Sequence, residues 1–356
     1  MFFQSEDESE IAKNFKQDVI NLVLVAEHSK ININSLIAAA NTKGTMIAGG
    51  IFPMVISEDQ NYESGIVLKY IATAEPPYLI KANGPSDLSA QLPEMDSDTQ
   101  SCIILFDGLM TDIPRMLHDV YEKYWDKLAF VGGGAGSLTL QQTPCVFNNE
   151  GIFQDAALLI PSSLRANSGV KHGWTKIAGP YIANKTAGNQ ILELNWRPAF
   201  EVYKEVVEET GDLNFSSTDF FDISKGFPFG IQKEGQEVIV RDPIAVEGNV
   251  LTCVGPVSQN VSLYILKGEK DHLINSAKEA AETAMQSKNY KESLLIDCIS
   301  RVLYLGSDFQ EELAAIQKPM KSNIPLEGAL TLGEVSSSIE GLLELYNKTT
   351  VVTTFS

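Results

Sequence analysis

The sequence predicts an α/β (α+β) fold in which mixed β-sheets are flanked by helices. Three observations support this prediction. Short apolar runs are typical of buried strands, amphipathic segments of helical period lie between them, and the order strand, helix, strand, strand occurs three times. A chain of 356 residues, 44% of them hydrophobic, is also long enough to form two domains.

The three strand–helix–strand–strand units are predicted near the N-terminus, in the middle and at the C-terminus of the chain. The first has a strand over 21–29, a helix over 33–44 and strands over 45–57 and 64–72. The second has a strand over 101–109, a helix over 112–126 and strands over 127–137 and 155–163. The third has a strand over 293–301, a helix over 307–320 and strands over 324–335 and 347–355. In each unit the strand after the helix contains glycine, which indicates close backbone packing or a bend.

A region of different character separates the second unit from the third. Strand-like pieces alternate with glycine turns over 168–195, and an amphipathic helix is expected over 197–211. An antiparallel meander over 227–269, with turns at 233–236 and 246–249, and a helix over 271–286 follow. We therefore predict an acidic N-terminal extension over 1–19, a first domain over 20–210 and a second domain over 211–356.

Composition limits the possible partners and location. The formal net charge of −19 disfavours nucleic acid and anionic lipid. The acidic start MFFQSEDESE does not match a signal peptide, and no apolar run approaches the length of a membrane span. We expect a soluble, cytoplasmic protein. The cysteines and histidines are scattered, so a zinc site made by the protein alone is not expected.

The glycine run FVGGGAGS, residues 130–137, raises the question of a phosphate-binding loop. Counted from Gly132, the third glycine position of a dinucleotide-binding fingerprint is occupied by Ser137. The segment that follows contains Pro144 and is not expected to open a helix, and no Walker A lysine follows the run. The run is therefore not a nucleotide loop.

An ordered series of segments resembles the FIST domain, a sensory module with N-terminal and C-terminal halves. The segments are VGGGAG, QTPCVFNNEGIFQDAALLI, GVKHGW, TAGNQILELNWRPAFEVY, FPFGI, VRDP, GPVSQNVSLYIL and GEV before LYNKTTVV. The resemblance implies a signal-input protein that binds a small ligand, with amino acids proposed, and passes the signal to a histidine kinase or diguanylate cyclase. Some members of the family resemble haem proteins that sense nitric oxide. No kinase or cyclase segment is present, so signalling in trans is expected.

Several residues are candidates for ligand binding, and each also has a purely structural interpretation. His172, beside Trp174, suits a ligand carboxylate, a haem iron or a hydrogen bond to the backbone. Arg241 and Asp242 suit a ligand carboxylate or a local turn with Pro243. The remaining candidates are Glu334 for a ligand ammonium group, Asn347 for a ligand or the facing turn, and the glycines Gly132, Gly133 and Gly134.

Catalysis has little support in the sequence. No G-x-S-x-G motif is present, and Cys145, the cysteine least clearly in an apolar strand, has no basic neighbour. The first hypothesis is therefore a sensor of an amino acid or similar metabolite, held between the two halves. The alternative is a haem-based nitric oxide sensor with His172 as axial ligand, and an enzyme is the least favoured class.

Overall fold

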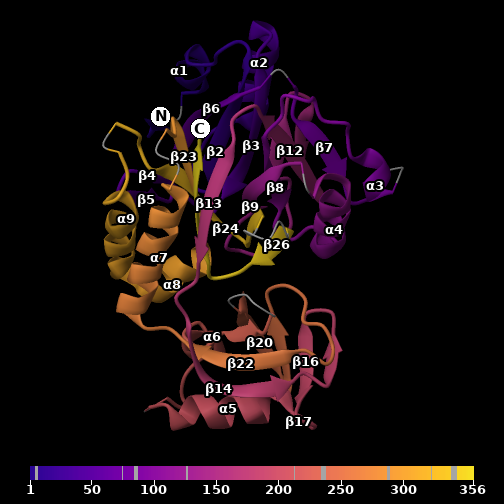
Figure 1. The fold of residues 1–356 in the computed structure, drawn as a ribbon, viewed down its shortest axis with the longest axis vertical. Coiled ribbons are helices and arrows are strands. Elements are labelled where there is room, and N and C mark those ends of the chain that lie inside the picture. Colours follow the sequence, from indigo (N-terminus) through magenta and orange to yellow (C-terminus); the bar gives the residue numbers. More distant parts are fainter. Residues whose placement is uncertain are drawn as a thin grey trace.

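The computed structural model describes residues 1–4, 7–73, 75–83, 87–125, 127–211, 213–233, 238–286, 289–321, 323–337 and 343–356. These residues form a large lobe and a small lobe (Figure 1). Within this described part, the large lobe contains three six-stranded mixed sheets and the small lobe contains two smaller antiparallel sheets. The mixed α/β class predicted from the sequence is confirmed.

The three sheets of the large lobe are built from strands that are distant in sequence. The first has the order β1 (Phe2–Phe3), β6 (Ile66–Ala72), β2 (Val19–Ala26), β3 (Met46–Phe52), β10 (Val146–Asn148) and β11 (Gly151–Phe153). The second has the order β26 (Leu343–Tyr346), β25 (Glu334–Ser337), β9 (Ala129–Ala135), β8 (Ser101–Asp107), β12 (Ala156–Ser162) and β7 (Tyr78–Lys81). The third has the order β13 (Ala166–Lys171), β27 (Thr350–Phe355), β23 (Glu292–Cys298), β24 (Glu327–Thr331), β4 (Met54–Ser57) and β5 (Gln60–Tyr62).

The same pairing pattern occurs at the centre of each of these sheets. β2, β8 and β23 each pair in parallel with the next strand of the unit, β3, β9 and β24 respectively. Each also pairs antiparallel with a later strand, β6, β12 and β27. The chain then crosses between sheets, because β4 pairs with β24, β10 with β3, and β25 with β9. These three exchanges join the sheets into one body; that the units are repeats stays a prediction.

Glycines in the parallel strands permit this close pairing. In each case the glycine lies against a carbonyl oxygen of the central strand, so that a side chain has no room. A Cβ would lie 2.1 Å from the oxygen of Val23 at Gly49, 1.8 Å from that of Ile104 at Gly132 and 1.8 Å from that of Leu295 at Gly328. Glycine is therefore required by backbone packing at these three positions.

Helices cover the outer faces of the three sheets and enclose a shared core. Helices α1 (Glu8–Lys13) and α2 (Ile33–Lys43) pack on the first sheet, and α3 (Leu88–Gln91) and α4 (Ile113–Tyr124) on the second. Helices α7 (Lys270–Ala284), α8 (Ile299–Leu305) and α9 (Phe309–Gln317) pack on the third. Between the sheets, side chains such as Leu22, Leu105 and Ile296 form one apolar core.

The small lobe is formed by residues 175–267, which lie between β13 and α7 (Figure 1). One sheet has the order β14 (Thr175–Ile182), β22 (Ser262–Lys267), β18 (Phe229–Ile231) and β19 (Ile239–Arg241). The other has the order β15 (Lys185–Ala187), β16 (Gln190–Leu194), β21 (Val250–Cys253) and β20 (Pro243–Glu247), with β17 (Arg197–Pro198) on β16. Helices α5 (Ala199–Glu209) and α6 (Phe220–Ser224) complete its core.

Most predicted elements occur near the predicted residues, with a few differences. The expected strand 293–301 is wrong at its end, because α8 begins at Ile299. The expected strand 45–57 is divided at Pro53 into β3 and β4, which lie in different sheets. The expected turn at 233–236 lies largely outside the described residues. The domain boundary at residue 210 would fall inside the small lobe, after α5, and stays a prediction.

Candidate functional site

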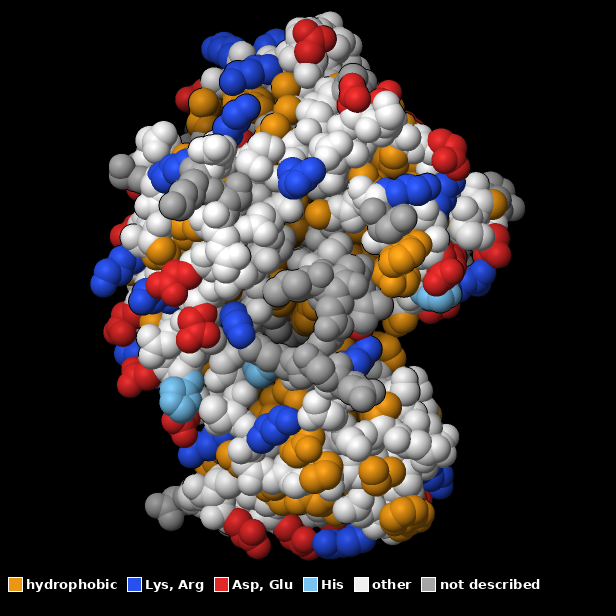
Figure 2. Space-filling view, in the orientation of Figure 1, with side chains coloured by type: hydrophobic (Ala, Val, Ile, Leu, Met, Phe, Trp, Pro, Cys, Tyr) orange, Lys and Arg blue, Asp and Glu red, His pale blue; other side chains and the backbone are white. Residues whose placement is uncertain are grey.

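A pocket of about 380 Å³ lies where the two lobes meet. The large lobe contributes α4 and β26 to its wall, and the small lobe contributes the end of β19 and the loop after β21. Figure 2 shows the surface hollowed between the lobes on the side of α4. Its lining is mostly apolar, with a few charged groups: Pro114, Leu117, His118, Tyr121, Glu122, Arg241, Pro256, Leu343, Glu344 and Leu345. Pockets at such interfaces commonly bind small molecules.

Arg241 is the buried cation of this pocket, with 6% of its surface exposed. Its guanidinium donates to carbonyl oxygens of Pro256 (3.0 Å) and Leu345 (3.2 Å). Among the described residues, no carboxylate lies within ion-pair distance of it. Burial lowers the pKa of Arg241 to about 10, so the side chain is still charged near neutral pH. A buried guanidinium that contacts only neutral groups is well suited to an anionic ligand.

Asp242, the next residue, faces the large lobe and forms an ion pair with Lys348. The Lys348 Nζ lies 3.1 Å from Asp242 Oδ2, and both side chains are buried. Lys348 Nζ also donates to the carbonyl oxygen of Lys225, at the end of α6 (2.9 Å). Burial raises the pKa of Asp242, while Lys348 and the hydroxyl of Ser300 oppose that rise. Two adjacent residues of the small lobe therefore face different places: Arg241 faces the pocket, and Asp242 faces the large lobe at the junction.

Trp174 contacts Lys348 at the place where the chain first crosses between the lobes, after β13; the second crossing, before α7, contains Gly268. Its indole Nε1 donates to the carbonyl oxygen of Lys348 (3.0 Å), and the Lys348 ammonium lies 4.9 Å from the ring centroid. At the second crossing, Gly268 lies against the Trp174 ring, where a Cβ would be 2.4 Å from the ring. The hydroxyl of Tyr304 donates to the Gly268 carbonyl (2.7 Å). Both crossings therefore pack around one tryptophan.

His172 lies at the first crossing and is held by its neighbours. Its Nδ1 accepts a hydrogen bond from the amide of Trp174 (2.9 Å), and its carbonyl oxygen accepts one from Arg301 (2.6 Å). The side chain is buried, with 9% of the residue exposed. It does not line the interlobe pocket. Because Nδ1 accepts the amide hydrogen, the neutral imidazole carries its own hydrogen on Nε2, and a haem iron would need this arrangement to change before either nitrogen could bind it.

Glu334 and Asn347 both lie beside Lys348: Asn347 precedes it in the chain, and Glu334 contacts the amide of Thr349, the residue that follows it. Glu334 is fully buried and accepts hydrogen bonds from Thr331 (2.9 Å) and from the amide of Thr349 (3.4 Å). Burial raises the pKa of Glu334 well above its ordinary value. Asn347 Oδ1 lies 3.5 Å from the Arg241 guanidinium. The structure thus gathers His172, Trp174, Arg241, Asp242, Glu334 and Asn347 near the lobe junction.

The predicted glycines lie deeper, inside strand β9. Gly133 pairs with Glu334, and a Cβ at Gly133 would lie 2.7 Å from Thr331. The amide of Gly134 donates to the carbonyl oxygen of Gly333 (2.8 Å). Backbone packing accounts for the glycines, and a role for Gly132, Gly133 or Gly134 in ligand binding stays a prediction.

Sequence reasoning missed the charged residues that hold the junction together. Lys348 pairs with Asp242 across the junction, and Arg301 donates a hydrogen bond to the carbonyl oxygen of Lys348. Arg301 donates to Glu312 and to the carbonyl oxygens of Leu273 and Lys348. The available signal was two charges four residues apart, Asp297 and Arg301, in the otherwise apolar segment 293–305. Such residues are almost never fully buried unless paired.

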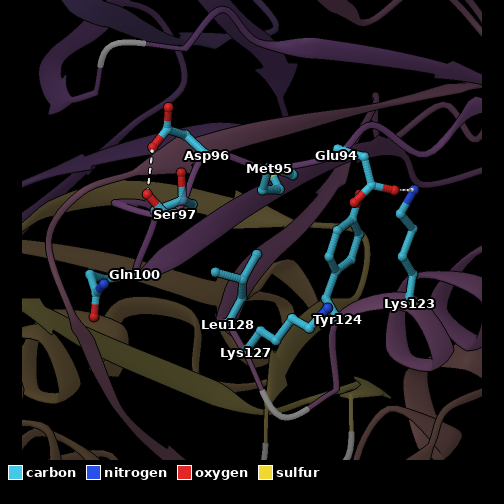
Figure 3. A pocket seen from close by; sticks show the side chains of 10 residues that line it. Glu94, Met95, Asp96, Ser97, Gln100, Lys123, Tyr124, Lys127 and Leu128 are labelled. Atoms are coloured by element: carbon cyan, nitrogen blue, oxygen red, sulfur yellow. Dashed lines mark hydrogen bonds and ion pairs between the residues drawn. The ribbon is translucent and has the colours of Figure 1, made fainter.

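A second pocket, of about 390 Å³, lies beside the C-terminal end of α4 (Figure 3). Figure 3 shows Lys123 beside Glu94, and their ion pair measures 2.8 Å. Lys123 also donates to the carbonyl oxygen of Leu92 (2.9 Å), and Glu94 is exposed to solvent. This lysine is therefore already paired, whereas Arg241 has no anionic partner among the described residues. We place the candidate site at the interlobe pocket.

The described residues contain neither a metal-binding cluster nor a membrane-spanning helix. No cluster of three or more His, Cys, Asp or Glu side chains among them could hold a metal ion. No helix within them is both long and apolar enough to cross a membrane.

Comparison of the sequence with models of known protein families shows which family the chain belongs to. Both halves of the chain match a class of domain associated with sensory signal transduction. Residues 21–197 match the FIST N domain and residues 199–337 match the FIST C domain. The chain belongs to the FIST family. Among curated proteins, no sequence matches it.

Proposed function

We propose that this chain is a cytoplasmic sensory protein whose interlobe pocket binds a small polar ligand with a carboxylate group, such as an amino acid. It signals in trans to a partner such as a histidine kinase or diguanylate cyclase, and it acts as a sensor rather than as an enzyme. Its membership of the FIST family supports the sensory role.

The observation that carries the proposal is the buried, charged Arg241 in the wall of the interlobe pocket. The hydrogen bonds of Arg241 all go to neutral oxygens, and Glu344 acts on it only through its charge. A ligand carboxylate can bind the guanidinium through two parallel hydrogen bonds. Leucine and proline side chains line part of the same pocket. Glu122 offers a carboxylate to a ligand ammonium group, whereas Glu344 is paired with Lys233 (2.8 Å). This combination of groups suits an α-amino acid with an apolar side chain.

The contacts around Arg241 suggest how a bound ligand is signalled. Arg241 donates to Leu345 of β26, and Asp242 holds Lys348 just beyond the end of that strand. A carboxylate that draws Arg241 away from Leu345 changes the contact between β19 and β26. Ligand binding then favours one arrangement of the lobes over another, as in a population shift. The partner protein reads that arrangement.

Calorimetric titration with L-amino acids tests the proposal, with the matching primary amines as ligands that lack only the carboxylate. We expect an amino acid to bind and its amine to bind at least about tenfold more weakly, because the contact with Arg241 is lost. Arg241→Lys should weaken amino acid binding, whereas Arg115→Gln, at an exposed arginine paired with Asp87, should not. Equal binding of amine and amino acid, or no binding by any amino acid, would overturn the proposal.

The haem alternative rests on His172 and on the resemblance to haem-containing family members. In its favour, the imidazole is buried at the lobe crossing, where an iron ligand could influence the arrangement of the lobes. Against it, the ring is already oriented by the Trp174 amide, and His172 lies outside the wall of the interlobe pocket. We therefore favour the carboxylate ligand.

A further inference from the structure

The turn between β16 and β17 displays a tryptophan in a backbone conformation that tryptophan disfavours. Leu194 pairs with Arg197, so the hairpin has a two-residue loop, Asn195 and Trp196. Both residues have positive φ angles, 49° and 61°. This is a type I′ turn, in which asparagine followed by glycine is the preferred pair. Asn195 fits the preference, and Trp196 stands where glycine is expected.

Trp196 is nevertheless held firmly and presented to solvent. Asn195 Oδ1 accepts a hydrogen bond from the amide of Ile182 (2.7 Å), and the amide of Trp196 donates to Asn184 Oδ1 (2.8 Å). The tryptophan itself is 76% exposed, the most of any large hydrophobic residue described. A residue in a strained conformation whose side chain is mostly exposed is a candidate for a functional role.

Helix α5, which follows this turn, carries acidic residues along one side. Glu201, Glu205 and Glu209 recur at four-residue spacing and are exposed, while Val202 and Tyr203 are buried. Arg197 binds Glu205, the middle residue of this stripe, through two hydrogen bonds, which fixes the stripe to the turn. In Figure 1, α5 and β17 form the end of the small lobe farthest from the large lobe. Figure 2 shows charged and hydrophobic side chains together along that edge.

We infer that Trp196 and the acidic stripe Glu201, Glu205 and Glu209 form a docking surface for a partner protein with a basic face and an apolar pocket for the indole. Charge complementarity supports this occupant, since the chain carries a net charge of −19. The same charge disfavours a second copy of the chain and an anionic membrane. The surface goes beyond the proposed ligand site and does not depend on Arg241.

The test compares the immobilised protein with its Trp196→Gly variant in a lysate of the source cells. A protein retained by the former alone is then purified and titrated against each variant. We expect Trp196→Gly to weaken binding at least about tenfold, as for a buried aromatic anchor, and Trp196→Tyr to restore most of it. Glu201→Lys with Glu209→Lys, which spares the Arg197–Glu205 pair, should also weaken binding and reduce its dependence on salt. Trp125→Ala, at another exposed tryptophan (55%), is the matched control and should bind normally.

Stability and ligand binding show whether the Trp196→Gly variant loses the docking surface alone or its folded structure as well. Glycine relieves the left-handed strain, so the melting temperature of Trp196→Gly should equal or exceed that of the original protein. Amino acid binding at Arg241 should be unchanged in this variant, so failure of one proposal leaves the other intact. The inference is overturned if Trp196→Gly retains the same proteins with equal affinity. It is also overturned if ultracentrifugation shows a dimer of the chain that this variant abolishes.

Discussion

The ammonium group of Lys348 lies 3.1 Å from the carboxylate of Asp242, and this buried ion pair joins the large lobe to the small lobe. Lys348 stands in a turn with a positive φ of 52°, a conformation in which lysine is uncommon. The turn follows β26, whose residues line the candidate ligand pocket. The ion pair therefore connects the pocket wall to the lobe junction.

Removal of this lysine should be costly for stability. We expect Lys348→Met to lower the free energy of unfolding by about 3–5 kcal/mol, because Asp242 is then left as an unpaired buried charge. Urea denaturation measures this change. In the double variant Lys348→Met with Asp242→Asn, the loss should be smaller than the sum of the single losses.

An exposed ion pair provides the control. Lys270 contacts Asp308 and Glu311 at the surface, and Lys270→Ala should lower the free energy of unfolding far less than Lys348→Met does. If Lys348→Met costs no more than this, the buried pair does not hold the lobes together.

The pH dependence of stability should report on Glu334. Burial raises the pKa of Glu334 well above its ordinary value, so the native state holds this proton more tightly than the unfolded state does. As pH rises from the ordinary value of 4.5 toward the raised value, the free energy of unfolding falls. Glu334→Gln removes this titration, and denaturation between about pH 5 and 8 should show a shallower fall.

Asp297, whose pKa is also raised by burial, should keep part of the slope in that variant. Glu94→Gln is the control, because hydrogen bonding to Lys123 lowers the pKa of Glu94 and places its titration below this range. An identical slope in Glu334→Gln and the original protein would contradict the assignment.

Local patterns in the sequence were sufficient for most of the fold. The apolar runs around β2, β8 and β23 predicted buried strands, and Gly44 marked the end of α2, where its φ is 64°. The start of α8 was missed because residues 293–305 are mostly apolar on both sides of Asp297 and Arg301, and short apolar runs do not distinguish a strand from a helix. The exchange of β4, β10 and β25 between sheets depends on long-range pairing, which no local pattern encodes.

The candidate site was predictable only in part, for a similar reason. Arg241 was predicted as a binding residue because a guanidinium suits a carboxylate, and the structure places Arg241 in a pocket wall. Lys348 was not predicted, because lysine is usually exposed and the burial of Lys348 depends on Asp242 from a distant segment. The glycines of β9 were conspicuous in the sequence, yet the contact of Gly132 with Ile104 is a packing requirement.

The packing of Gly268 against Trp174 makes a sharp prediction about the lobe crossing. A Cβ at residue 268 would lie 2.4 Å from the Trp174 ring and 2.8 Å from that of Tyr304. We expect Gly268→Ala to lower the free energy of unfolding by about 1–3 kcal/mol, because both rings have to move. Gly211→Ala, at a position with no atom within 4 Å, should be neutral or slightly stabilising. Equal stability of the two variants would show that the crossing is loosely packed.

Titration with haem separates the two sensor hypotheses. We expect a broad visible spectrum that does not saturate and is the same in the original protein and in His172→Ala, because the imidazole is already engaged with the Trp174 amide. His272→Ala, at a histidine with 54% of its side chain exposed, controls for binding to surface histidines. A sharp, stoichiometric Soret band that His172→Ala abolishes and His272→Ala preserves would instead make the protein a haem sensor. The buried crossing at His172 would then be the sensory site, and the amino acid proposal for Arg241 would fail.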